Sequence, residues 1–128
     1  MKLVVKEKIW SAGKVNHVQS FEFPPFELVE GRRTVVASND YETIKTKGFL
    51  KKKQVLMYES EIIFAFTPLK IKENSVVFKT EGVSGNFWKT RMDKNTKPQK
   101  FELKIGESKE FDSPTFDRGF DYTITLEN

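Results

Sequence analysis

The chain has 128 residues, the size of one ordinary domain, so the sequence predicts a single domain over residues 1–128. With no cysteine and one histidine, it excludes a disulfide framework, a thiolate nucleophile and metal sites that need several Cys or His ligands. Val, Ile, Thr, Phe, Tyr and Trp number 45, against 13 for Ala, Leu and Met, which favours strands over helices. The net charge of +4 divides into +8 over residues 1–100 and −4 over residues 101–128.

The first two expected strands cover residues 3–10 and 15–23, where apolar residues recur with a period of about two. Pro24 and Pro25 end the second strand, because proline has no backbone donor for a ladder. In residues 3–10, Leu3, Val5 and Ile9 lie on one side and Lys6 and Lys8 on the other, which indicates a half-buried strand.

A hairpin is expected next, because residues 26–29 and 33–37 flank a short connection that contains Gly31. Ser, Asn and Asp at residues 38–40 predict a second turn. Residues 41–47 then resemble a polar edge strand, whose lysines discourage pairing with another sheet.

The most apolar stretches are residues 54–58 and 61–67, which are expected to be two separate strands. Residues 62–66 are apolar at both parities, which predicts a central strand covered on both faces. Pro68 is expected to close this strand.

The C-terminal third alternates most regularly, at residues 101–105 and 120–126, with a shorter strand expected at 109–111. Residues 76–80 and 87–92 flank a glycine-containing connection and predict a further hairpin. About nine short strands separated by turns indicate an all-β fold, either an antiparallel β-sandwich or a partly closed β-barrel.

A lysine-rich strip is the most concentrated chemical feature. Residues 45–53 hold five lysines and one aromatic residue without any acid, and a second basic stretch surrounds Trp88. Lysine clusters attract phosphates through counterion release, and an exposed aromatic ring can stack on a base. The residues predicted to bind a polyanion are Lys45, Lys47, Phe49, Lys51, Lys52, Lys53, Trp88, Lys89 and Arg91.

The same lysines have a simpler interpretation as gatekeepers beside the apolar residues 55–57. A different hypothesis places a protein partner at a rigid apolar corner formed by Phe23, Pro24, Pro25 and Phe26, which would otherwise be a buried corner. The twelve phenylalanines leave a third hypothesis open, a barrel that binds a small molecule or lipid, although a packed core uses the same residues.

Catalytic signals are sparse. His17 and Ser84 are the most suggestive base and nucleophile, but the segment around Ser84 lacks the final glycine of a nucleophile elbow. Asp112, Asp117 and Asp121 could meet around a hard cation, yet their spacing matches no EF-hand, and turn and surface roles are favoured. We therefore expect a protein that is not an enzyme and uses no metal or cofactor.

Charges within residues 1–9 do not fit a signal peptide, and the longest apolar run has five residues, far short of a membrane helix. The sequence therefore predicts a basic, cytoplasmic domain without membrane insertion. The favoured function is binding or assembly with a macromolecule, through a protein partner or self-association. Binding of nucleic acid or another polyanion is the main alternative.

Overall fold

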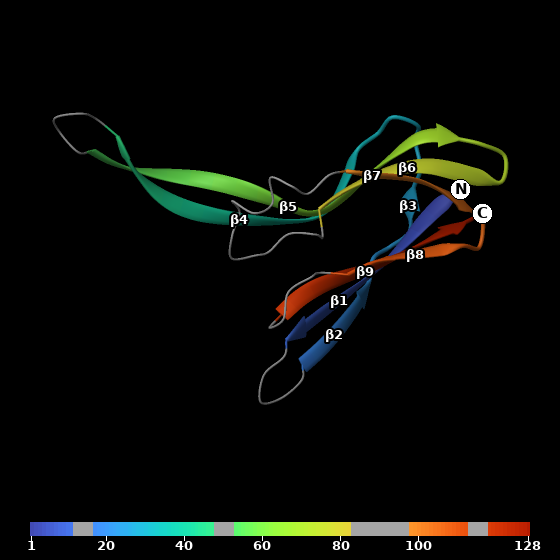
Figure 1. The fold of residues 1–128 in the computed structure, drawn as a ribbon, viewed down its shortest axis with the longest axis horizontal. Coiled ribbons are helices and arrows are strands. Elements are labelled where there is room, and N and C mark those ends of the chain that lie inside the picture. Colours follow the sequence, from blue (N-terminus) through green and yellow to red (C-terminus); the bar gives the residue numbers. More distant parts are fainter. Residues whose placement is uncertain (12–16, 48–52, 83–97, 113–117) are drawn as a thin grey trace.

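Alternating apolar and polar residues form strands through most of the part that the structure, a computed structural model, describes: residues 1–11, 17–47, 53–82, 98–112 and 118–128. Nine strands occur in these ranges, and they form two antiparallel sheets that pack against each other (Figure 1). The all-β prediction is confirmed, and of its two architectures the β-sandwich is observed rather than a closed barrel.

The first sheet has β1 (Lys2–Ser11) and β9 (Arg118–Glu127) at its centre, paired from Lys2↔Glu127 to Ser11↔Arg118. β8 (Ser108–Phe111) lies outside β9. On the other side of β1 lie β2 (His17–Glu22) and the two-residue β3 (Phe26–Glu27), separated by the two prolines. The strands expected near both chain ends are therefore confirmed.

The second sheet has the order β4-β5-β6-β7. Its strands are β4 (Thr34–Lys47), β5 (Lys53–Ile71), β6 (Ser75–Gly82) and β7 (Gln99–Lys104). The expectation of uniformly short strands is wrong for this sheet, because β4 has 14 residues and β5 has 19.

The core lies between the sheets and consists of inward-facing residues at alternate positions. The Phe64 ring of β5 stacks on the Tyr122 ring of β9, with centroids 4.7 Å apart, and thereby joins the two sheets. Rings bury large apolar areas, and such pairs add stabilisation beyond that area. The core cluster contains Leu3, Val5, Phe64, Phe66, Val76, Phe78, Leu103, Phe111, Tyr122, Ile124 and Leu126.

One connection differs from expectation. The hairpin predicted around residues 30–32 is not formed, because β3 pairs with β1 in one sheet while β4 pairs with β5 in the other. Gly31 does adopt a positive φ of 80°, and its amide donates to the carbonyl of Pro68 at 2.7 Å. The turn therefore binds to β5 and carries the chain from one sheet to the other.

Two strand ends predicted in the second sheet are also wrong. Residues 38–40 continue β4 because each pairs with a residue of β5. Pro68 does not close β5 but lies buried within it, opposite Phe78. The register shifts between Pro68 and Lys70, which accommodates a residue without a backbone donor. Central burial is confirmed for Phe64, Ala65 and Phe66, whereas Ile62 and Ile63, in the same predicted segment, are half buried.

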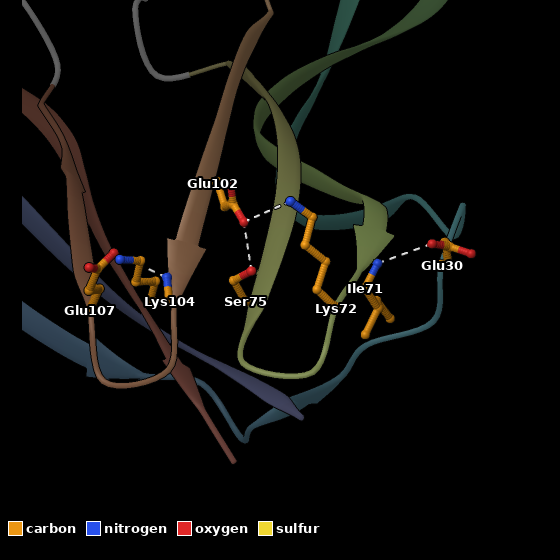
Figure 2. Close-up of polar contacts among 7 residues, drawn as sticks. All are labelled: Glu30, Ile71, Lys72, Ser75, Glu102, Lys104 and Glu107. Atoms are coloured by element: carbon orange, nitrogen blue, oxygen red, sulfur yellow. Dashed lines mark hydrogen bonds and ion pairs between the residues drawn. The ribbon is translucent and has the colours of Figure 1, made fainter.

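Glutamate side chains form hydrogen bonds with residues in and beside the turns at one end of the sandwich (Figure 2). Glu102 of β7 accepts hydrogen bonds from the Ser75 hydroxyl at 2.6 Å and the Lys72 ammonium at 3.0 Å, which lower the pKa of its carboxyl group. Glu30 accepts from the amide of Ile71 at 3.0 Å and fixes the sheet-to-sheet connection against the end of β5. These glutamates have structural roles.

Candidate functional site

The most distinctive feature of the molecule is a two-stranded projection, which we call the arm: residues 39–47 of β4 paired with residues 53–61 of β5. The register runs unbroken from Asn39↔Glu61 to Lys47↔Lys53. β6 pairs with β5 only from Phe64 onward, so among the described strands nothing else pairs with the arm. Figure 1 shows β4 and β5 running out together beyond the strands of both sheets. Nine residue pairs at about 3.3 Å each extend it by about 30 Å.

Charges of opposite sign occupy opposite ends of the arm. The half nearer the sandwich carries Asp40, Glu42, Glu59 and Glu61, whereas residues 43–57 contain five lysines and no acid. Lys45 and Lys47 end β4, and Lys47 pairs directly with Lys53 at the start of β5. The backbone therefore brings lysines from both strands together at the outer end.

The one apolar side chain of the arm whose burial the structure describes is exposed. Leu56, opposite Ile44 in the register, is 51% exposed, although leucine is usually buried. A two-stranded hairpin is at best marginally stable alone in water, because it has no third strand or packed layer. An arm of this kind therefore has little stability of its own.

The structure brings together only part of the predicted strip. Lys45, Lys47 and Lys53 lie at the end of the arm, as described above, whereas Phe49, Lys51 and Lys52 lie outside the described residues. The second basic stretch, with Trp88, Lys89 and Arg91, is also outside them. The strand expected at residues 87–92 is not described for the same reason.

The proline corner has a divided environment. The rings of Phe23 and Phe26 are half buried and pack against the core, with Phe26 against Phe66 at a centroid distance of 5.6 Å. Pro24 and Pro25 are exposed. The amide of Phe23 still donates to the carbonyl of Val5 at 3.0 Å, so the corner follows the edge of β1.

The acidic residues near the C-terminus do not form a metal centre in the part that the structure describes. Asp112 is exposed, Asp121 is half buried on β9, and Asp117 lies outside the described residues. No group of three or more His, Cys, Asp or Glu side chains among the described residues is arranged to hold a metal ion. A hollow of about 220 Å³ is lined by Asp112 and Asp121. Lys6 and Lys8 line it as well, so positive charges already lie beside these carboxylates.

The sequence patterns did not indicate one partly buried polar pair. The hydroxyl of Tyr122, which is fully buried, donates to the Glu7 carboxylate at 2.6 Å. Burial, together with this hydrogen bond, raises the pKa of Tyr122 well above its ordinary value of 10.0. The sequence does contain a signal for it, because Glu7 continues the alternating, inward-facing series of Leu3 and Val5.

The suggested catalytic pair is described only in part. His17 lies on β2, whereas Ser84 is outside the described residues.

Comparison with known proteins finds no matching family model, no similar curated protein and no similar solved structure. No helix in the described part of the chain is long and apolar enough to cross a membrane. The closed barrel on which the small-molecule hypothesis depended is not observed.

Proposed function

We propose that this domain binds a polyanion, with single-stranded nucleic acid as the ligand that fits best, through the lysine-rich outer end of the arm. The observation that carries the proposal is the position of the lysines. Lys45, Lys47 and Lys53 lie at the end of a projection of about 30 Å, remote from the packed sandwich, and the sequence between them adds Lys51 and Lys52. The sandwich is then the support from which the arm reaches its ligand.

Electrostatics favour a contact with phosphates that does not depend on base sequence. Lysine is a compact point charge, and it lacks the planar fork with which arginine recognises guanine or phosphate in a bidentate manner. A cluster of five lysines releases counterions when it neutralises phosphates, so its affinity falls steeply as salt rises. Phe49, at the centre of the segment, supplies a ring of the kind that stacks on unpaired bases.

The four acidic residues of the inner half limit the contact to the outer half, because they repel phosphates. Neutral residues separate the two groups on each strand, Thr43 and Ile44 on β4 and residues 54–58 on β5. The ligand is therefore expected to touch the end of the arm and to be kept away from its base.

The decisive experiment compares two variants of equal net charge by fluorescence anisotropy with a labelled single-stranded oligonucleotide. The arm variant replaces Lys45, Lys47, Lys51, Lys52 and Lys53 with Gln. The control replaces five exposed lysines of the sandwich with Gln: Lys2, Lys8, Lys70, Lys100 and Lys104.

The unmodified chain is expected to lose about 100-fold in affinity between about 50 and 200 mM salt, for about five phosphate contacts. The arm variant should lose most of its affinity, and the slope of log K against log salt should become shallower by about 3 to 4. The slope for the control should differ from that of the unmodified chain by no more than about the contribution of one phosphate contact. Salt-insensitive binding, absence of binding, or equal losses in both variants would exclude the arm as the polyanion site.

A further inference from the structure

Among the sheet edges that the structure describes, one has no lysine to discourage pairing with another chain. The described structure has edges at β2 and β8 in the first sheet and at β4 and β7 in the second. An edge strand presents unpaired backbone donors and acceptors to any extended chain, and lysine is a common means of blocking such contacts. Lysines occur in three of these strands, at Lys45 and Lys47 in β4, Lys100 and Lys104 in β7, and Lys109 in β8. β2 has none.

β2 also exposes an apolar side chain on each face. Val18 is 56% exposed and Phe21 is 55% exposed. Val18 lies opposite Trp10, whereas Phe21 lies opposite Glu7 on the face that forms the core farther along the sheet. A strand added beside β2 would shield both, and the backbone edge it would pair with requires an extended chain.

We propose that β2 pairs antiparallel with β2 of a second copy of this chain, so that the first sheets of two molecules become continuous. Charge supports a second copy as the partner. Glu22 is the only residue of β2 with a formal charge at neutral pH, and its carboxylate lies 3.9 Å from the Lys6 ammonium of its own chain. Two copies of β2 therefore meet without unbalanced like charges, whereas the same pairing of β4 or β7 would bring lysines together.

The symmetry of such a dimer defines the pairing. In an antiparallel pair with a two-fold axis perpendicular to the sheet, one residue of each copy faces its own counterpart. A register centred on Gln19 places Val18 opposite Ser20 and Phe21 opposite His17 of the second copy. Each exposed apolar residue thus gains a cross-strand neighbour. The overlap is short, so the dimer is weak and depends on concentration.

A single introduced thiol tests the register, because the chain has no cysteine. Gln19→Cys would place two thiols on the axis, where opposed Cα atoms are about 4.5 to 5.5 Å apart, within the range of a disulfide. We expect a disulfide-linked dimer on mild oxidation, detected on a non-reducing gel. The matched control is Lys100→Cys, an exposed position on the β7 edge, which should remain monomeric at the same concentration.

The mass in solution tests the dimer without an added thiol. The average mass measured by light scattering should rise from 14.9 kDa towards twice that value between about 10 µM and 1 mM protein. Val18→Lys should hold the protein monomeric, while Val29→Lys, a lysine at an exposed position outside the strands, should leave the increase unchanged. A monomer throughout, an unaffected Val18→Lys variant, or equal cross-linking at positions 19 and 100 would overturn the proposal.

Discussion

The sandwich and the arm share β5 but depend on different interactions. From Phe64 to Phe66, β5 pairs with β4 on one side and β6 on the other, and it contributes Phe64 and Phe66 to the core. Over residues 53–61 the same strand pairs only with β4 in the described structure. Burial of apolar area stabilises β5 from Phe64 onward. Residues 53–61 have only one ladder of hydrogen bonds in the described structure, and each hydrogen bond contributes little net free energy. One strand therefore anchors the fold and extends away from it.

The largest effect is expected from truncating the ring that joins the two sheets. Phe64→Ala should lower the free energy of unfolding by about 3 to 5 kcal/mol, because it leaves a cavity against Tyr122 and Phe111. Leu56→Ala on the arm should cost less than about 0.5 kcal/mol, since that side chain is already largely exposed. Urea denaturation followed by circular dichroism measures both. Similar losses would contradict the division between sandwich and arm.

Gly82 marks the place where β6 ends beside β5, and its replacement should have the next largest effect. Its φ of 92° is unfavourable for other residues, and an added Cβ would collide with the carbonyl oxygen of Ile63. We expect Gly82→Ala to destabilise the fold by about 3 kcal/mol. Gly31→Ala is the control, because its φ is also positive but the space around it is open, and it should cost about 1 kcal/mol. If denaturation experiments gave the same loss of stability for both variants, the collision with the Ile63 carbonyl would not contribute to the effect of Gly82→Ala.

Tyr122→Phe tests the polar pair at the margin of the core and should have a smaller effect. Loss of the hydrogen bond to Glu7 should lower stability at pH 7 by about 1 to 2 kcal/mol. Because folding raises the pKa of Tyr122, its contribution is fully present below about pH 10 and is lost as the pH rises further, since the unfolded chain ionises first.

The unmodified protein should therefore lose more stability than Tyr122→Phe between about pH 9 and 11, as measured by thermal unfolding at several pH values. Tyr122 is fully buried, and the phenyl ring preserves its packing, which makes the comparison specific for the hydroxyl group. Parallel losses in the two proteins would show that this hydroxyl does not contribute to the alkaline transition.

Much of the sandwich is predictable from the sequence because local alternation and burial agree there. In β9, Tyr122, Ile124 and Leu126 alternate with polar residues, and all three are fully buried. The errors occur where a long-range contact overrides a local signal. Pro68 remains within β5 because the register shifts beside it, and the turn at Gly31 bonds to Pro68 rather than closing a hairpin.

The candidate site is less predictable, because its chemistry is visible in the sequence but its position is not. The five lysines of residues 45–53 are evident, yet Ser, Asn and Asp at residues 38–40 resemble a turn that would end the strand before them. Pairing with Glu61 and Ser60 carries β4 through Asn39 and Asp40 and so creates the arm. This continuity depends on partner residues 20 and 22 positions away in the sequence, which a local pattern does not contain.

Removing the arm itself should have only a small effect on stability. Residues 39–61 can be replaced by Asn-Gly, a two-residue hairpin turn, between Ser38 and Ile62, which are partners in the register. The buried residues described on β5 begin at Phe64, so the core is retained, and the free energy of unfolding should change by less than about 1 kcal/mol. The shortened protein should nevertheless lose salt-dependent binding to the oligonucleotide while keeping the sheet signal in circular dichroism. A loss of stability as large as that of Phe64→Ala would instead place the arm within the folding unit. Unchanged binding by a folded, shortened protein would show that the arm is not the polyanion-binding site.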